Sequence, residues 1–405
     1  MIITIISATE KGGAGASSKN LYQGLLKIGV EANLLTIDDL EKENLSLIAK
    51  ISRWWKVRKS INRNFRSMKG APSGFDYFSL ARTGYTNLHK HPLVLKADVI
   101  NVHWISNMID YKTFFNNIDK PIVWTLHDTN AFTGGCHYTY QCDNFMRDCS
   151  NCKQLGETFS SYVAKENLEL KRDSLKLLKP EDTIVISPSK WLQSLSEKSL
   201  LFKQYAHFNV PNGIDTAIFR KYESKESRER FSLPLDKFIV LFVATNITET
   251  RKGFDVILKI EEIFRDNKNV LFVAIGNVEA KYNHIANLGY IADKETIAAA
   301  YNAANVFLIP SREDNLPTTM LESLCCGTPV IGYKTGGIVD TIEDGKNGYL
   351  IDHENINDMV NKINIMIDNP DLFDNKTISN VSRQKYSLKK QAETYLNIIN
   401  KLFVH

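Results

Sequence analysis

Acidic and basic side chains gather in two stretches of the second half of the chain. PSREDNLPTTMLES contains Glu313 and Asp314, and Glu322 follows eight residues after Asp314. ITETRKGFD contains Arg251 and Lys252. Guanidinium and ammonium groups neutralise phosphate, and carboxylates accept hydrogen bonds from sugar hydroxyls. The two stretches therefore predict a site for a diphosphate joined to a sugar, with a solvated basic turn and chance acids as the alternative.

A glycine-rich loop follows the apolar run at the N-terminus. KGGAGASS holds Gly12, Gly13 and Gly15. Glycines let backbone N–H groups approach an anion closely at the N-terminus of a helix. The loop is a candidate phosphate or acceptor site, although a tight turn without a ligand would have the same sequence. His127 ends another apolar run and is a second candidate, whereas His103 is expected to be a structural side chain.

Four cysteines lie close together in the segment 133–152, just downstream of His127. One CxxC pair and two looser steps can surround a tetrahedral ion but do not match a standard zinc-finger spacing. Clustered cysteines in a reducing compartment are more often metal ligands than disulfides. A structural zinc, disulfides and unligated thiols all stay open for Cys136, Cys142, Cys149 and Cys152.

The elements that must position these residues alternate between apolar runs and helical patterns. Strand-like runs occupy 1–6, 32–38, 97–104, 121–128 and 182–187, and again 237–244, 269–276, 287–291, 305–310, 328–333 and 348–351. Helical patterns occupy 157–177, 253–266, 294–303, 317–326 and 356–368. Apolar runs without alternation are typical of parallel strands covered on both faces. The pattern predicts two doubly wound, Rossmann-like α/β domains with a boundary near residue 208, and most of the candidate residues directly follow strands.

Composition limits the class of protein. The chain has 405 residues, 43% of them hydrophobic and 24% charged, which suits globular domains. A formal net charge of +4 is too small to indicate nucleic acid as a partner. The N-terminus has no basic leader, and no apolar stretch of about 18 residues or more is present, so we expect a cytoplasmic protein without a membrane span.

The segment 50–69 is strongly basic. It carries eight Lys or Arg and no acid, and its aromatic and aliphatic residues recur at roughly helical intervals. Such a cationic amphipathic helix suits an anionic membrane surface. We therefore keep peripheral binding to the inner face of the plasma membrane as a hypothesis, and a solvated helix whose tryptophans belong to the core is the alternative.

The segment 310–351, which ends in GGIVDTIEDGKNGYLI, resembles the donor-binding half of glycosyltransferase family 4, the retaining GT-B enzymes. VPNGIDTAIF, RKGFD, LGYI and HD after the fourth strand are further matches. EDNLPTTMLES and WTLHDTNAFTGGCHY look like a subgroup associated with bacterial surface polysaccharides. The Gly-Arg pair that usually precedes the lysine is absent, because ATNI occupies its place.

The resemblance implies GT-B architecture, with two domains facing a central cleft. Residues 1–208 would bind the acceptor, residues 209–387 would bind the nucleotide-sugar, and a last helix within 388–405 could pack back on the first domain. The implied reaction is retaining and needs no metal and no cofactor besides the UDP- or GDP-sugar. The acceptor would be a glycan or a lipid-linked glycan of an O-antigen, capsule or exopolysaccharide.

The resemblance also implies roles for single residues. Lys252, with Arg251, would hold the donor diphosphate, and Glu322 would bind the ribose. The family has two acids separated by seven residues. Glu313 keeps the residue type of the first acid, whereas Asp314 keeps the seven-residue separation from Glu322. We favour Glu313 as the first acid. His127 would face the transferred sugar. The other residues expected to line the donor site are Asn315, Leu316, Thr318 and Tyr290.

Other classes of protein explain less of the sequence. A nucleotide-sugar epimerase of the same fold would need groups that reprotonate a sugar carbon, and no dedicated pair is evident. An NAD-dependent oxidoreductase could use the glycine loop but leaves 251–337 unexplained. A noncatalytic protein that binds lipid or nucleic acid through 50–69 gives no reason for the acids and cations at the strand ends.

Overall fold

The structure of the protein is a computed structural model that describes residues 1–42, 78–81, 85–155, 158–244, 249–276, 282 and 284–403. The basic segment 50–69 and its predicted membrane helix lie outside the described residues. The chain forms two compact units: unit 1 contains Met1–Pro211 and Gln391–His405, and unit 2 contains Asn212–Lys390. Each unit is described by itself below.

Unit 1 is built on a six-stranded parallel sheet with the order β2-β1-β3-β4-β5-β6. The strands are β1 (Ile2–Ile6), β2 (Glu31–Leu35), β3 (Val99–Val102), β4 (Ile122–Thr125), β5 (Thr183–Ser187) and β6 (Ala206–Asn209). β3, β4 and β5 are buried along their whole length. Their continuous apolar sequences fit this burial, because each face of the sheet is covered.

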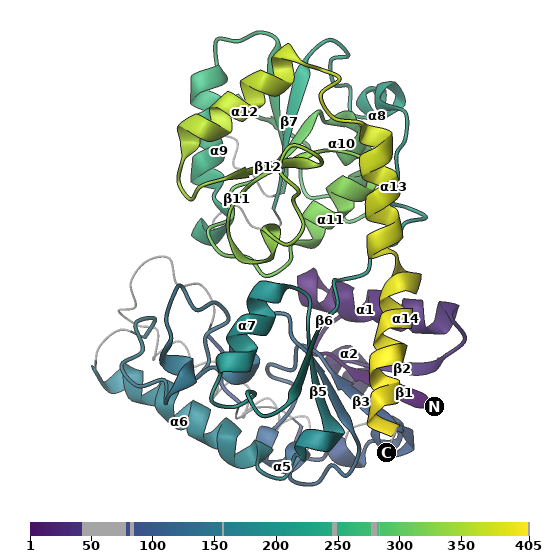
Figure 1. Cartoon of the computed structure of the whole chain (residues 1–405), viewed down its shortest axis with the longest axis vertical. Coiled ribbons are helices and arrows are strands. Elements are labelled where there is room, and N and C mark those ends of the chain that lie inside the picture. The colour runs from purple at the N-terminus through teal and green to yellow at the C-terminus, as the bar shows by residue number, and fades with distance from the viewer. Residues whose placement is uncertain are drawn as a thin grey trace. The chain divides into compact units, whose positions relative to one another are not determined.

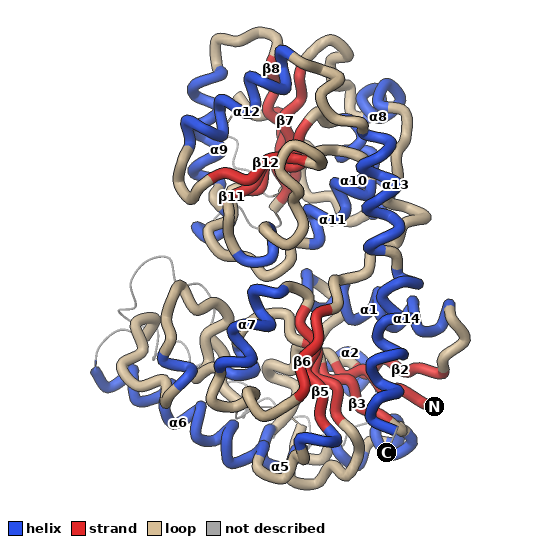
Figure 2. The backbone as a smooth tube through the Cα atoms, viewed as in Figure 1, coloured by secondary structure: helices blue, strands red, loops and turns tan. Residues whose placement is uncertain are grey.

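Helices cover the sheet of unit 1 on both faces (Figures 1 and 2). The α-helices are α1 (Gly12–Lys27), α2 (Ile37–Lys42), α4 (Pro92–Lys96), α5 (Tyr111–Phe115), α6 (Thr158–Leu175) and α7 (Lys190–Lys198). Short 3-10 helices are η1 (Leu88–Lys90), η2 (Asn130–Phe132), η3 (Asn144–Met146) and η4 (Pro180–Asp182). Side-chain caps fix several starts: the Ser189 hydroxyl accepts a hydrogen bond from the Leu192 N–H at the start of α7, at 3.0 Å.

Unit 2 repeats the architecture with a parallel sheet of order β12-β11-β10-β7-β8-β9. Its strands are β7 (Phe238–Val243), β8 (Val270–Ile275), β9 (Ala286–Asn287), β10 (Val306–Ile309), β11 (Val330–Tyr333) and β12 (Gly348–Ile351). Its helices are α8 (Ser224–Arg230), η5 (Thr250–Lys252), α9 (Phe254–Phe264), α10 (Lys294–Ala303), α11 (Thr318–Cys325), η6 (Gly336–Ile338), α12 (Ile356–Asp368) and α13 (Asn375–Tyr386).

The last helix, α14 (Leu388–Ile399), continues into η7 (Asn400–Phe403) and joins the core of unit 1 from Gln391 onward. Tyr395 and Ile399 are 1% and 0% exposed and pack with Ile3 and Val99. The Tyr395 hydroxyl also lies 3.2 Å from the Thr125 hydroxyl. The chain therefore returns to its first domain after completing the second.

The predicted fold class, two doubly wound α/β domains, is confirmed by the two parallel sheets. Two local predictions were wrong, and one strand was missed. The strand expected at 287–291 is only β9, and the run expected to reach residue 38 ends at Leu35, with α2 beginning at Ile37. β6 was not predicted, because it lies at the sheet edge and its residues AHFN are partly or fully exposed, so they need no apolar run.

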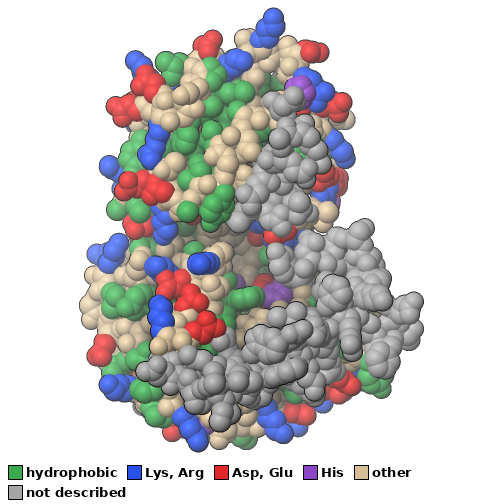
Figure 3. All heavy atoms as spheres, turned by 180° about the vertical axis from the view of Figure 1, so that it is seen from behind, with side chains coloured by type: hydrophobic (Ala, Val, Ile, Leu, Met, Phe, Trp, Pro, Cys, Tyr) green, Lys and Arg blue, Asp and Glu red, His purple; other side chains and the backbone are tan. Residues whose placement is uncertain are grey.

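The surface of the described residues carries charges of both signs. On the face shown in Figure 3, Lys and Arg side chains are interspersed with Asp and Glu. The described part of this face therefore has no continuous basic stripe of the kind that binds nucleic acid. No helix within the described ranges is long and apolar enough to cross a membrane.

Candidate functional site

Acids and cations of unit 2 meet at the carboxyl ends of two neighbouring strands, β7 and β10. β10 lies between β7 and β11, and all three are parallel. The chain leaving β7 leads to η5, which contains Arg251 and Lys252. The chain leaving β10 leads to Glu313 and Asp314, so loops about 60 residues apart in sequence converge at one edge of the sheet, as expected for this type of fold.

Asp314 is the centre of this cluster. Its Oδ2 atom lies 2.6 Å from Lys252 Nζ and 3.2 Å from Arg251 Nη1. Arg251 also donates from Nη1 to the Glu313 backbone carbonyl at 2.9 Å and contacts Glu249 at 3.1 Å. Burial by itself would raise the pKa of Asp314, but the charges of Lys252 and Arg251 hold it below its ordinary value. Asp314 is therefore ionised and pins both cations.

The two cations differ in exposure. The side chain of Arg251 is 5% exposed, and that of Lys252 is 27% exposed. Arg251 is thus a buried brace between η5 and the acid loop, whereas Lys252 keeps part of its surface toward solvent. Its ammonium is the one that a ligand at this edge can reach more readily.

Two glycines let the loops approach each other. Gly253 has φ +74°, and a Cβ there would lie 2.1 Å from the Pro310 carbonyl oxygen. Gly336 has φ +52°, and a Cβ there would lie 1.6 Å from the Asp314 carbonyl oxygen. Both positions need a left-handed backbone and a missing side chain, which only glycine supplies without strain. The close packing of η5, the acid loop and η6 therefore depends on sequence features inside RKGFD and KTGG.

Glu322 lies within α11, whose N-cap is Pro317. The Tyr301 hydroxyl donates a hydrogen bond to Glu322 Oε2 at 3.3 Å. Burial raises the pKa of Glu322 from 4.5 to about 7, although the hydrogen bond from Tyr301 works in the opposite direction. Near neutral pH the carboxyl group is therefore balanced between its acid and carboxylate forms. Tyr301 was not singled out in the sequence, because a buried tyrosine in a helical pattern carries no signal of its partner.

The other residues predicted to bind the donor differ in burial and in position along unit 2. Asn315 and Leu316 are buried between Asp314 and α11, at 5% and 6% exposure. Thr318 is the first residue of α11 and is partly buried. Tyr290 follows β9 and is 62% exposed. The structure thus brings Asn315, Leu316 and Thr318 to the start of α11.

In unit 1 the glycine loop follows β1 and forms the first turn of α1. A Cβ at Gly15 would lie 2.6 Å from the Thr9 carbonyl oxygen, whereas Cβ atoms at Gly12 and Gly13 would meet nothing within 4 Å. Packing therefore requires a glycine at position 15. Gly12 and Gly13 border open space, and the role of all three glycines in binding an anion or an acceptor stays a prediction.

His127 follows β4, and His103 follows the neighbouring strand β3. The His127 Nε2 and His103 Nδ1 atoms are 2.8 Å apart. Both residues line a pocket of about 270 Å³ that Trp104, Asp128 and Asn130 also border. Burial lowers the pKa of His127 to about 4, against the opposing charge of Asp128. The expectation that His103 is an ordinary structural side chain missed this contact with His127.

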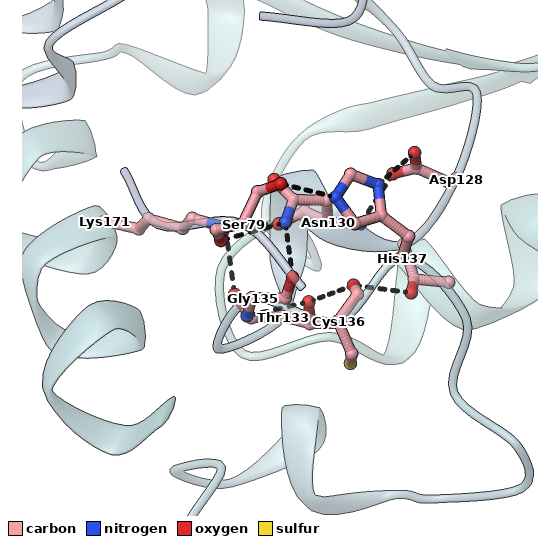
Figure 4. A network of polar contacts seen from close by, with 9 residues as sticks. Ser79, Asp128, Asn130, Thr133, Gly135, Cys136, His137 and Lys171 are labelled. Atoms are coloured by element: carbon pink, nitrogen blue, oxygen red, sulfur yellow. Dashed lines mark hydrogen bonds and ion pairs between the residues drawn. The ribbon is translucent and has the colours of Figure 1, made fainter. Parts of the chain in front are cut away.

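A second polar network surrounds Asp128 (Figure 4). One carboxylate oxygen accepts the Asn130 N–H at 2.8 Å, and the other lies 2.6 Å from His137 Nδ1. His137 Nε2 lies 2.9 Å from the Ser79 hydroxyl. The fully buried Lys171 donates to the backbone carbonyls of Asn130 and Thr133. The loop after His127 is therefore held by charged hydrogen bonds, which are among the stronger ones.

The four clustered cysteines line one pocket of about 470 Å³. Nevertheless, across the described part of the chain no three His, Cys, Asp or Glu side chains come together as metal ligands. The Cys149 sulfur instead accepts the Gly134 N–H at 3.2 Å, and burial raises the pKa of the Cys149 thiol to about 12 and also raises that of Cys136. The predicted zinc set of Cys136, Cys142, Cys149 and Cys152 is not supported, and all six cysteines of the chain have free thiols.

Comparison with known proteins gives a family match in unit 2. Residues 223–387 match the family described as glycosyl transferases group 1. A D-inositol 3-phosphate glycosyltransferase of Acidothermus cellulolyticus is 30% identical over 165 residues, which are 35% of this chain and 36% of that relative. An uncharacterized glycosyltransferase of Haemophilus influenzae is 25% identical over 162 residues, 36% of this chain and 45% of that relative. The matches thus span less than half the length of these relatives.

Structural similarity extends over nearly the whole chain. Sucrose-phosphate synthase from Thermosynechococcus elongatus has a TM-score of 0.64 at 18% identity, covering 99% of both chains. Anabaena Alr3699/HepE, solved in complex with UDP, has a TM-score of 0.61 at 14% identity, covering 98% of this chain and 99% of that chain. At these identities the likeness shows the fold, and it confirms the predicted GT-B class of two Rossmann-like domains. The family match confirms the resemblance to glycosyltransferases for residues 223–387.

Proposed function

We propose that this GT-B protein, whose residues 223–387 match the group 1 glycosyl transferases, moves a sugar with retention from a UDP- or GDP-sugar to a glycan or lipid-linked acceptor. The observation that carries the proposal is the cluster of Arg251, Lys252 and Asp314 at the carboxyl ends of β7 and β10, inside the matched region. Curated relatives that are similar to this chain are named glycosyltransferases.

Unit 2 would bind the donor. Lys252 is the more exposed cation of the pair and would contact the diphosphate, together with backbone N–H groups at the start of α11. Arg251 would act mainly by holding the acid loop, since it is buried against Glu313 and Asp314. Glu322 would bind the ribose hydroxyls in its carboxylate form. The remaining side chains that would line the donor site are Tyr290, Asn315, Leu316 and Thr318.

The first acid would be Glu313. The carboxylate of Asp314 holds Lys252 and Arg251, which supports a role for Asp314 in placing these cations. Carboxylates accept hydrogen bonds from sugar hydroxyls, which suits recognition of the transferred sugar by Glu313. The seven-residue gap that favours Asp314 would then reflect its role in placing the cations.

Unit 1 would bind the acceptor, with Gly12 and Gly13 at an open edge, and His127 in its pocket would face the transferred sugar. In the reaction, the bond between the anomeric carbon and the diphosphate oxygen breaks, and the acceptor oxygen forms a bond on the same face. The leaving phosphate takes the acceptor proton, so no protein nucleophile is required. Lys252 would neutralise the charge that builds on the leaving group, which makes the reaction independent of an added metal.

A role in bacterial surface polysaccharide synthesis is the finer part of the proposal. It rests on the resemblance of EDNLPTTMLES and WTLHDTNAFTGGCHY to a subgroup of that kind. A lipid-linked acceptor would place the protein at the inner face of the plasma membrane. The basic segment 50–69 would supply the contact with anionic lipid.

The test is a transfer and hydrolysis screen with UDP- and GDP-sugars, with and without EDTA. We expect release of one nucleoside diphosphate from one donor, unchanged by EDTA, and a product whose anomeric configuration by NMR equals that of the donor. Silence across the panel in folded protein would contradict the proposed activity. An inverted product would contradict retention alone.

A further inference from the structure

A row of hydrogen bonds runs from His127 into the core of unit 1. His127 Nε2 lies 2.8 Å from His103 Nδ1, and His103 Nε2 lies 2.8 Å from Asn101 Oδ1. The Asn101 amide nitrogen lies 2.9 Å from the Val123 carbonyl oxygen and 2.9 Å from the Thr125 hydroxyl. Asn101 is 0% exposed and His103 is 4% exposed. The row therefore begins at a backbone atom in the sheet and ends at the pocket.

The direction of each hydrogen bond in this row can be assigned from its buried end. The Val123 carbonyl oxygen can only accept, so the Asn101 group facing it must be the amide nitrogen. The Asn101 oxygen then faces His103, which must donate from Nε2. A neutral imidazole carries one proton, so His103 Nδ1 is an acceptor and His127 Nε2 must donate to it.

The neutral state of His103 is supported by its surroundings. Burial lowers its pKa well below the ordinary value, and the neighbouring His127 lowers it further. The side chain nearest its Nε2 is the amide of Asn101, which carries no charge. A second proton on His103 would put a positive charge on a buried ring whose neighbours are the Asn101 amide and the His127 imidazole. Burying such a charge without an acidic partner costs free energy.

We infer that Asn101 and His103 are positioning residues that hold His127 with its proton on Nε2, so that His127 Nδ1 is a hydrogen-bond acceptor. Any ligand group that meets Nδ1 must then be a donor, such as a sugar hydroxyl, and not a carbonyl or phosphate oxygen. In this state His127 cannot donate a proton from Nδ1. The identification of the ligand as a sugar rests on the proposed function. The assignment of the His127 tautomer does not depend on it.

The direct test is the 15N NMR of the histidine side chains in the full-length protein, at neutral pH. The resonances of His103 and His127 are assigned by comparison with variants lacking each residue. We expect both residues to be neutral, with the proton on Nε2 and an unprotonated Nδ1. A proton on Nδ1 of His127, or two protons on either ring, would overturn the inference.

A matched pair of substitutions tests which group fixes the tautomer. In His103→Asn, the amide oxygen can replace Nδ1 as the acceptor, so His127 should keep its Nε2 proton. In His103→Phe, the acceptor is lost, and we expect the Nδ1 and Nε2 tautomers of His127 to mix. An unchanged His127 spectrum in folded His103→Phe would overturn the assignment to His103. If His103→Phe does not fold, His103→Asn still tests the assignment. Loss of the Nε2 proton of His127 in folded His103→Asn would overturn it.

The kinetic readout separates the inference from the proposed function. If transfer occurs, His103→Phe should lower kcat by roughly tenfold to a hundredfold through a misplaced imidazole, and His103→Asn should restore most of it. Equal kcat values for wild type and His103→Phe would contradict a positioning role. If no sugar is transferred by the wild type, the proposed function fails, while the NMR result still decides the tautomer.

Discussion

At the scale of single residues, neighbouring side chains determine whether a buried carboxyl group is ionised or neutral. Asp314 is buried but stays ionised between Lys252 and Arg251, whereas Glu322 is held by one tyrosine hydroxyl and has a raised pKa. These two carboxyl groups of unit 2 thus differ in charge near neutral pH. The sequence shows both acids and their spacing, but it does not show which basic side chain reaches which acid.

Glu322→Gln should change the pH dependence of stability. Because burial raises the folded pKa of Glu322 above 4.5, to about 7, the protonated form is favoured in the folded protein. The stabilisation that the protonated Glu322 side chain gives the folded protein is fully present below pH 4.5. This stabilisation is lost as pH rises through about 7. We therefore expect Glu322→Gln to match wild type near pH 4.5 and to exceed its free energy of unfolding by about 1–3 kcal/mol at pH 8.

The measurement is urea unfolding at several pH values. Glu262→Gln on the exposed face of α9 is the control and should follow the wild-type curve. A Glu322→Gln curve parallel to wild type from pH 4.5 to 8 would show that burial does not shift the carboxyl group as described.

At the scale of elements, glycines and strand order bring the site together. η5 follows β7 and the acid loop follows β10, and these strands are neighbours. Gly253 permits the contact of the turn before α9 with Pro310. RKGFD and its position after an apolar run were visible in the sequence. The contact with Pro310 was not, because sequence alone does not show which strands are adjacent.

Gly253→Ala should disturb this contact more than a left-handed backbone alone would explain. Gly345 has nearly the same φ, +75° against +74°, but a Cβ there would meet nothing within 4 Å. We expect Gly345→Ala to cost about 1 kcal/mol from backbone strain, and Gly253→Ala to cost a further 1–3 kcal/mol or so from the clash. Equal losses in the free energy of unfolding would mean that the Pro310 contact is easily relieved.

The histidines and cysteines show the same limit of sequence reasoning. His103 and His127 meet because β3 and β4 pair in parallel and end side by side. The cysteines do line one pocket, as their spacing suggests, yet within the described residues they do not come together as a metal-ligand set. Spacing predicted that the cysteines lie close together, but it predicted neither the contact between His103 and His127 nor the atoms that make the hydrogen bonds.

At the scale of the whole molecule, the chain crosses from unit 1 to unit 2 and returns through α14. A last helix was expected within 388–405, with packing on the first domain named as an option. In the structure, Ala392, Tyr395 and Ile399 of this helix are buried with residues of β1 and β3. The stability of the first unit therefore depends on the last residues of the chain.

Ile399→Ala should loosen unit 1 and leave unit 2 unchanged. Removing a fully buried isoleucine costs about 2–5 kcal/mol, depending on how far the cavity collapses. Hydrogen exchange should become faster in β1 and β3 and stay unchanged in β7 and β8. Asn397→Ala, on the exposed face of α14, is the control. Faster exchange in β7 and β8 with β1 unchanged would contradict this placement of the helix.

The measurement that tests the proposed donor site most directly is the affinity for UDP and GDP by titration calorimetry, in wild type, Lys252→Ala and Lys259→Ala. Lys259 lies exposed on α9 and controls for loss of positive charge. We predict that the wild type binds one of the two nucleotides, that Lys252→Ala weakens binding by about tenfold or more, and that Lys259→Ala does not. Wild-type affinity in folded Lys252→Ala, or no binding of either nucleotide by the wild type, would contradict a diphosphate site at the end of β7 and β10.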